Sequence, residues 1–225
     1  MLITKSKFLA GTQCLKRLYW LVHSPELAVQ PDESDQSIIE QGREVGLLAR
    51  TMFPGGVVVD ASNREQAIRA TRDLINNPEV PAIFEAALEH QNVFVRVDVL
   101  QRRRDQRWRL IEVKSTTDVK NHHLADVAIQ HRVVVARSGV DLAASCLAYV
   151  NREYVYEGGP IDVHRFFKIR NLTRQVECLQ PELAVQLRSE FRVLAMPGAP
   201  QIPTGRQCSD PFTCEFFDHC NPPLP

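Results

Sequence analysis

Three β-like segments stand next to one another in the middle of this chain, and helix-like segments precede and follow them. The β-like segments cover residues 82–89, 92–101 and 108–116 and are joined by short polar turns. A helix is expected at about 121–138, followed by an apolar strand at 142–150. The order helix, three strands, helix and strand predicts an α/β domain built on a mixed β-sheet.

Other elements are expected on both sides of this core. Helices are indicated from residue 4 to about 22, from 35 to about 52, from 63 to about 76 and near 181–194. Short strands are indicated at 57–59, at about 155–156 and at about 162–168.

Composition limits the class of protein. The chain has 225 residues, of which 44% are hydrophobic and 24% charged, so it can bury one substantial core. It has no apolar run of about 18 residues, and its N-terminal residues lack the apolar region and cleavage site of a secretory signal. Six cysteines without such a signal favour a reducing compartment. We therefore expect a cytoplasmic protein with no membrane partner.

The formal net charge is zero, so the chain as a whole does not attract nucleic acid. Such binding would depend on local basic groups, and the candidates are Lys5, Lys7, Lys16 and Arg17, the run 102–104, and Arg132 with Arg137. Ordinary solvated faces and turns carry similar groups. The basic residues alone do not distinguish the two interpretations.

Two acidic residues and a lysine interrupt neighbouring apolar strands. Asp98 lies in the segment 92–101, and Glu112 and Lys114 lie in the segment 108–116. Residues two apart on a strand point to the same face, so Glu112 and Lys114 share one side of the sheet. A hairpin between the two strands can set Asp98 beside Glu112. Paired carboxylates of this kind are typical ligands of a hard divalent cation, which can activate water against a phosphate, with the lysine stabilising the developing charge.

The same pattern has a structural alternative. Lys114 could form a salt bridge with Asp98 or Glu112 on an exposed sheet face, and spacing alone does not separate the two interpretations. The apolar neighbours of these residues indicate that the charges are half-buried. Because an unpaired buried charge is costly, half-burial favours a functional site.

Four cysteines form a second candidate site. Cys208, Cys214 and Cys220 are spaced C-x5-C-x5-C in a polar, proline-containing segment, and Cys14 is near the other end. Four thiolates suit an iron–sulfur cluster or a structural zinc ion. The wide gaps favour the cluster, because zinc sites usually contain closer cysteine pairs, whereas His219 beside Cys220 keeps zinc open. Two further cysteines, Cys146 in an apolar strand and Cys178, are interpreted as structural.

Together these residues resemble the PD-(D/E)XK nuclease superfamily, in its RecB-like branch. The pattern Asp98…Glu112-Val113-Lys114, followed by a helix that carries Gln130, is the part that resembles the nuclease core. The four cysteines make the chain similar to CRISPR-associated iron–sulfur exonucleases and to AddB-type nuclease domains. The segment 8–20 also resembles an uncharacterised group of bacterial proteins close to those exonucleases. The resemblance covers essentially the whole chain.

The resemblance implies a fold and a set of roles. It implies a restriction-endonuclease-like mixed sheet flanked by helices, with an αβββαβ core, and N- and C-terminal segments joined by a four-cysteine cluster lobe. Asp98, Glu112 and the Val113 carbonyl would hold Mg²⁺ or Mn²⁺, Lys114 would be the catalytic lysine and Gln130 would position substrate or that lysine. A [4Fe–4S] cluster would bind Cys14, Cys208, Cys214 and Cys220.

Two positions depart from the pattern of the family. Val134 stands where the glutamine motif usually continues to a tyrosine, and Gly46 stands about where many relatives have a metal-binding histidine. Glu44 or Glu85 would take the place of that histidine, and Glu85 is the candidate on the strand just before Asp98.

The expected organisation is a single nuclease domain over residues 1–225. Its catalytic core is expected at 35–150, and its cluster lobe at 1–24 plus 196–225. The expected function is a metal-dependent DNA exonuclease acting on single-stranded or frayed ends, with a larger nuclease, helicase or DNA-processing assembly as a potential partner. The alternatives are a non-catalytic nucleic-acid-binding or assembly module that keeps the cluster, and a zinc-stapled protein-interaction domain.

Overall fold

The computed structural model describes residues 1–61, 63–137 and 139–222. A seven-stranded mixed sheet forms its centre, with the order β2-β3-β4-β5-β6-β7 and with β1 paired to β4. The strands are β1 (Ile3–Thr4), β2 (Val57–Val58), β3 (Ala82–His90), β4 (Val93–Arg102), β5 (Trp108–Lys114), β6 (Leu142–Val150) and β7 (Phe167–Asn171). The mixed α/β fold expected from the sequence is confirmed.

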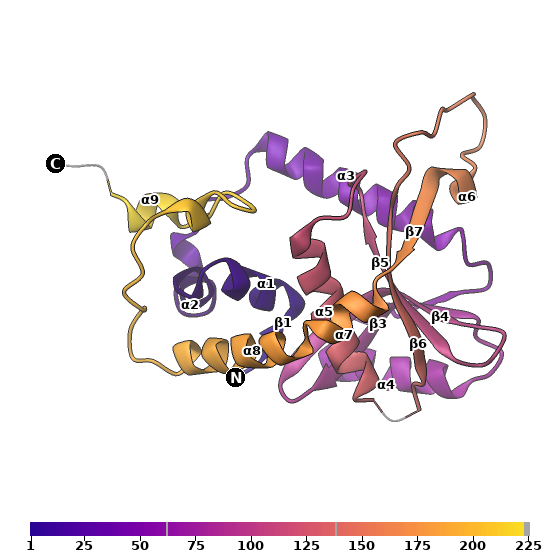
Figure 1. Cartoon of the computed structure of the whole chain (residues 1–225), viewed down its shortest axis with the longest axis horizontal. Coiled ribbons are helices and arrows are strands. Elements are labelled where there is room, and N and C mark those ends of the chain that lie inside the picture. Colours follow the sequence, from indigo (N-terminus) through magenta and orange to yellow (C-terminus); the bar gives the residue numbers. More distant parts are fainter. Residues whose placement is uncertain (62, 138, 223–225) are drawn as a thin grey trace.

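Helices flank this sheet (Figure 1). The α-helices are α1 (Lys5–Gln13), α2 (Leu15–His23), α3 (Glu33–Arg50), α4 (Arg64–Asn76), α5 (Asn121–Val135), α6 (Val163–Phe166), α7 (Thr173–Cys178), α8 (Gln180–Leu194) and α9 (Phe217–Cys220). Two 3-10 turns, η1 (Pro25–Leu27) and η2 (Arg206–Cys208), complete the described elements. Within the described chain, no helix is long and apolar enough to cross a membrane.

Each face of the sheet buries its own apolar cluster. Leu110 belongs to a cluster shared with α1, α4, α5, α7 and α8, and its neighbour Ile111 belongs to a second cluster under α3 and α6. This division follows from the strand period, because successive side chains point to opposite faces. The sheet is therefore covered on both sides, and the charged residues on its central strands are buried or half-buried.

Several local structures differ from the expectations. The first helix is two helices, because Cys14 has an extended backbone (φ −160°, ψ 122°) that separates α1 from α2. No described strand occupies 155–156. Most of the strand expected at 162–168 is the short helix α6, which forms because the Asp162 carboxylate accepts hydrogen bonds from the N–H groups of His164 and Arg165.

The sheet divides at β4, and this division positions the candidate site. On one side β4 pairs with β3 from Val93 to Gln101, with a single interruption at Asp98. On its other side β4 pairs with β5 from Val99 to Arg102 and with β1 at Val93 and Phe94. Strand β5 thus diverges from β4 beyond Val99, and β1 pairs with β4 further along. We call the opening between β1 and β5 the sheet fork.

Candidate active site

Asp98 stands at the start of the sheet fork. With its neighbour Val99 paired to Ile111, the next backbone pair would be Asp98 with Glu112, but the ladder has stopped. The Val113 N–H instead donates a hydrogen bond to Asp98 Oδ2 at 2.7 Å. The side chain of Asp98 therefore replaces a backbone acceptor where the two strands separate.

Glu85 lies opposite Asp98 on β3. The β3–β4 ladder runs through Phe84 with Val99 and through Ala86 with Val97, and the residues between them are not paired. Glu85 has a φ of +56°, a conformation that costs a non-glycine residue free energy. The Arg50 guanidinium contacts the Glu85 carboxylate at 2.8 Å.

A cleft of about 600 Å³ opens between α3 and these strands. All the acidic residues and the lysine predicted for the metal site line it, since its walls include Glu85, Asp98, Glu112, Val113 and Lys114. The α3 side of the cleft contributes Gly42, Arg43, Gly46, Leu47 and Arg50. The structure thus brings together, in one cleft, residues that the sequence placed on three different strands.

Glu112 is the most heavily contacted of these residues and is only 1% exposed. Lys5 Nζ lies 2.9 and 3.0 Å from its two carboxylate oxygens, and Lys114 Nζ lies 2.7 Å from Oε1. Gln130, which is fully buried on α5, donates to Glu112 Oε2 at 2.7 Å. The predicted site glutamine therefore fixes the Glu112 carboxylate by a hydrogen bond from helix α5.

Lys5 and Asp126 are part of the site, and the sequence did not identify either role. Asp126 is 1% exposed; its Oδ2 lies 2.6 Å from Lys114 Nζ and its Oδ1 lies 3.4 Å from Lys5 Nζ. Asp126 and Gln130 are four residues apart on α5 and so share one face of that helix. That spacing was the available signal for Asp126, whereas Lys5 was interpreted only as part of a basic helix.

Burial and the neighbouring charges shift the pKa values in opposite directions. Burial and the Glu112 charge raise the pKa of Asp98 to about 7. Burial alone would raise the pKa of Glu112 as well, but Lys5 and Lys114 lower it well below its ordinary value. Burial alone would lower the pKa of Lys114, but Glu112 and Asp126 raise it. The lysines therefore stabilise Glu112 as a carboxylate, whereas Asp98 is the carboxyl group left without a lysine partner in the described chain.

The salt-bridge alternative is partly realised. Lys114 forms an ion pair with Glu112, as that alternative expected, but the pair is half-buried rather than exposed, with Glu112 buried and Lys114 partly exposed. Within the described residues, no three His, Cys, Asp or Glu side chains are close enough together to hold a metal ion. The oxygen donors of Asp98, Glu112 and Val113 still suit Mg²⁺ or Mn²⁺, because Mg²⁺ commonly uses one or two protein carboxylates and keeps several waters.

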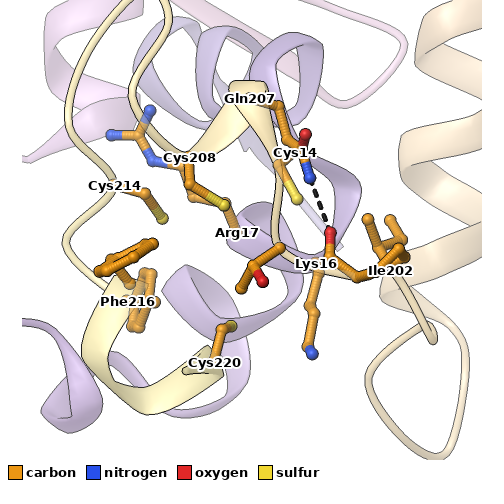
Figure 2. Close-up of a pocket in the computed structure, with 12 residues that line it drawn as sticks. Cys14, Lys16, Arg17, Ile202, Gln207, Cys208, Cys214, Phe216 and Cys220 are labelled. Carbon is orange, nitrogen blue, oxygen red and sulfur yellow. Dashed lines mark hydrogen bonds between the residues drawn. The ribbon is translucent and has the colours of Figure 1, made fainter. Parts of the chain in front are cut away.

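The four cysteines line one small cavity at the other end of α1 (Figure 2). The cavity holds about 20 Å³, and its walls also include Lys16, Arg17, Ile202, Phe216 and Phe217. Gln13, next to Cys14, donates hydrogen bonds of 2.7 Å to the carbonyl oxygens of both Gln207 and Phe212. The N- and C-terminal segments are therefore joined here, although the cysteines do not reach the spacing of a metal centre.

Cys146, Cys178 and His219 are not among the residues that line this cavity. Cys146 is 2% exposed on β6, as expected for a structural cysteine, whereas Cys178 is exposed. The ring of His219 packs against Trp20 with 4.9 Å between centroids. His219 therefore makes an aromatic packing contact with α2, and it is also the neighbour of Cys220 in the sequence.

No protein-family profile and no curated protein matches the chain. Among solved structures, the chain is similar to the crystal structure of SSO0001, with 11% sequence identity and a TM-score of 0.37. The match covers 89% of this chain and 87% of the other. A similarity at this level carries no conclusion about function. The geometry itself establishes a mixed α/β protein with a buried carboxylate–lysine cluster at the edge of a large cleft.

Proposed function

We propose that the protein is a metal-dependent nuclease of the PD-(D/E)XK type that acts on DNA. The observation that carries this proposal is the position of Asp98, Glu112 and Lys114 on one wall of a single cleft. Oxygen ligands and a lysine at one edge are the groups that phosphodiester hydrolysis requires.

The residues of the cleft can be assigned roles. Asp98, Glu112 and the Val113 carbonyl would hold Mg²⁺ or Mn²⁺, with Glu85 as an outer ligand, and the cation would polarise a phosphate oxygen. Lys114 would stabilise negative charge as it develops on the phosphate. Gln130 would fix the orientation of Glu112, to which it donates a hydrogen bond, and Asp126 would fix that of Lys114, from which it accepts one.

The opposite wall suits a nucleic-acid strand. Arg43 and Arg50 on α3 supply positive charge that can contact backbone phosphates. Nothing lies within 4 Å of where a Cβ of Gly42 or Gly46 would stand, so the wall is open beside these arginines. We propose a single strand or a frayed end as the substrate, the choice that the exonuclease expectation makes, with these arginines contacting its phosphates.

The cysteine cavity brings together the residues that a [4Fe–4S] cluster would use, although the thiols would have to move closer together to ligate it. Four thiols, the apolar side chains of Ile202 and Phe216, and the positive charge of Lys16 match the needs of an anionic cluster. We propose that the cluster is structural and holds the terminal segments together. Zinc remains the alternative occupant of the same thiols.

One observation favours a second function, a nucleic-acid-binding module without catalysis. Lys5 and Lys114 both pair with Glu112, so this carboxylate is already neutralised. In addition, Gly46 stands about where many PD-(D/E)XK nucleases have a metal-binding histidine, so that ligand is missing. A cation would then have to compete with two ammonium groups for Glu112.

DNA cleavage distinguishes the two functions. The assay uses end-labelled linear single strands and circular single strands, with Mg²⁺, Mn²⁺ or EDTA. We expect cation-dependent cleavage of linear strands, and intact circles if the protein is an exonuclease. Asp98→Asn, Glu112→Gln and Lys114→Met should each reduce the rate at least about 100-fold, on the scale of losing one charge-stabilising group.

Matched controls are available on the same sheet. Glu89→Gln on β3 and Lys168→Met on β7 each break an ion pair outside the cleft, with Arg64 and Glu153 respectively. Both should cut at the wild-type rate. DNA binding without cleavage by the wild-type protein under all cation conditions would instead support the binding module.

A further inference from the structure

Four charged side chains form a closed ring of alternating sign beside the cleft. Glu112 contacts Lys5 and Lys114, and Asp126 contacts the same two lysines, with N–O distances between 2.6 and 3.4 Å. We call these four residues the charge ring. Two positive and two negative groups make the ring neutral in itself.

The ring uses all four carboxylate oxygens. Glu112 Oε1 accepts from Lys5 and Lys114, and Glu112 Oε2 accepts from Lys5 and Gln130. Asp126 Oδ1 accepts from Gln130 at 2.9 Å and lies near Lys5, and Asp126 Oδ2 accepts from Lys114. Both carboxylates are 1% exposed, so they do not have bulk water as an alternative partner.

The position of Lys5 is set by the fold. Ile3 and Thr4 pair with β4 at the sheet fork, and the Thr4 hydroxyl caps α1 by accepting a 3.3 Å hydrogen bond from the Lys7 N–H. Lys5 is therefore held between a strand and a helix cap, as the first residue of α1. The Lys5 ammonium group is therefore held in a fixed position beside the carboxylates of Glu112 and Asp126.

Two-metal phosphodiesterases bind a pair of cations about 4 Å apart, and carboxylates hold them there. Here the ammonium group of Lys5 lies between Glu112 and Asp126, where a second cation would have to bind. We propose that Lys5 takes the place of a second divalent cation, so that the centre binds a single cation on its Asp98 side. This inference rests on the proposed metal-dependent function and specifies its stoichiometry.

The test counts Mn²⁺ ions by isothermal titration calorimetry and by electron paramagnetic resonance, neither of which depends on activity. The wild-type protein should bind one Mn²⁺ at the centre. Lys5→Met should bind two, because it removes the ammonium group that Lys5 places between Glu112 and Asp126 and leaves Lys114 as their one remaining lysine partner among the described residues. Lys5→Met combined with Asp126→Asn should return to one, because the second pair of carboxylates is broken.

Two further variants control for charge and helix position. Lys5→Arg keeps the positive charge and should bind one Mn²⁺. Lys7→Met removes a lysine from the same helix, outside the charge ring, and should also bind one. Near-ultraviolet circular dichroism follows the fold of each variant with and without Mn²⁺.

The outcomes separate this inference from the proposed function. Two ions on the wild-type protein, or one on Lys5→Met, would overturn the role of Lys5 and leave a metal-dependent centre in place. No ion on the wild-type protein would overturn the proposed function, and the inference with it. Lys5→Met that stays unfolded in Mn²⁺ also overturns the inference, because a cation able to replace the ammonium group would restore the fold.

Discussion

Asp98 accepts a hydrogen bond from the Val113 N–H at 2.7 Å, at the point where the strands that carry the two residues separate. The Asp98 carboxylate thus takes the place of a backbone carbonyl as hydrogen-bond acceptor where the pairing of β4 with β5 ends. Among the described residues, hydrogen bonds reach only Oδ2 of this carboxylate, so its other oxygen is free for a ligand from the cleft.

Asp98 and Glu85 should differ in their importance for cation binding. Asp98→Asn should weaken Mn²⁺ binding about 100-fold, because Asp98 has no lysine partner in the described chain. Glu85→Gln should weaken it less than about tenfold, since Arg50 already compensates the Glu85 charge. Calorimetric titration of both variants measures the difference, and equal losses would place Glu85 among the direct ligands.

The Gly46→His variant should strengthen cation binding. Gly46 lines the cleft, and a side chain there starts in open space. A histidine at this position would add a nitrogen ligand of the kind expected from the resemblance to PD-(D/E)XK nucleases, and we expect an affinity for Mn²⁺ at least about tenfold higher. Gly42→His, one turn away on the same wall, is the matched control. An equal gain in both variants would indicate a nonspecific effect.

The cysteine variants should form two groups, one that loses iron and one that retains it. Cys14→Ser, Cys208→Ser, Cys214→Ser and Cys220→Ser should each lose iron and visible absorbance, whereas Cys146→Ser and Cys178→Ser should retain both. A cluster that joins the two terminal segments closes a very long loop, so its loss should lower the free energy of unfolding by several kcal/mol, on the order that loop-closure entropy gives. Iron analysis and thermal melting test these expectations. A colourless Cys178→Ser protein, or an iron-replete Cys14→Ser protein, would show that the ligands are assigned wrongly.

Glu190 should make stability depend on pH. It is fully buried on α8, and burial raises its pKa to about 8, although Gln186 donates a hydrogen bond to it. Between its ordinary pKa near 4.5 and about 8, the folded protein binds more protons at this group than the unfolded chain does. Stability therefore falls as the pH rises through this range and levels off above it, with a total change on the order of several kcal/mol.

Thermal melting of Glu190→Gln from pH 5 to pH 9 checks this dependence. The variant should lose the decline between about pH 7 and pH 8, because its side chain does not ionise, whereas Asp98 with its raised pKa of about 7 still contributes a decline below that. Glu182→Gln changes an exposed carboxylate on the same helix and should keep the wild-type profile. A wild-type profile in Glu190→Gln would assign the decline to another group.

The sequence predicted the part of the site that depends on strand periodicity and missed the part that depends on the sheet fork. Glu112 and Lys114 share a face because they are two residues apart, and the hairpin brings Asp98 beside them. Lys5 joins them only because β5 diverges from β4 and β1 pairs in the space beyond. No local pattern predicts that divergence, which is set by long-range pairing of strands.

The helices show a similar division. The start of α4 near residue 63 was predicted correctly because it depends on neighbouring residues, with the Asn63 side chain accepting from the N–H groups of Glu65 and Gln66. The break at Cys14 was not predicted, because both flanking segments have helical patterns. Contacts of Gln13 with the C-terminal segment accompany that break, and such contacts leave no trace in the local sequence.

The N-terminal segment has a consequence for the order in which the protein folds. Ile3 pairs with Val93, Lys5 meets Glu112 across 107 residues and Gln13 meets Gln207 across 194. Contacts this distant in sequence form slowly, whereas the β3–β4 hairpin and helix α5 are local. We expect a kinetic intermediate in which Glu112 and Asp126 are close together before Lys5 arrives. Lys114 already lies between those carboxylates, so the last step is the attraction of Lys5 to them. Salt screens this attraction, and refolding should become slower as the salt concentration rises.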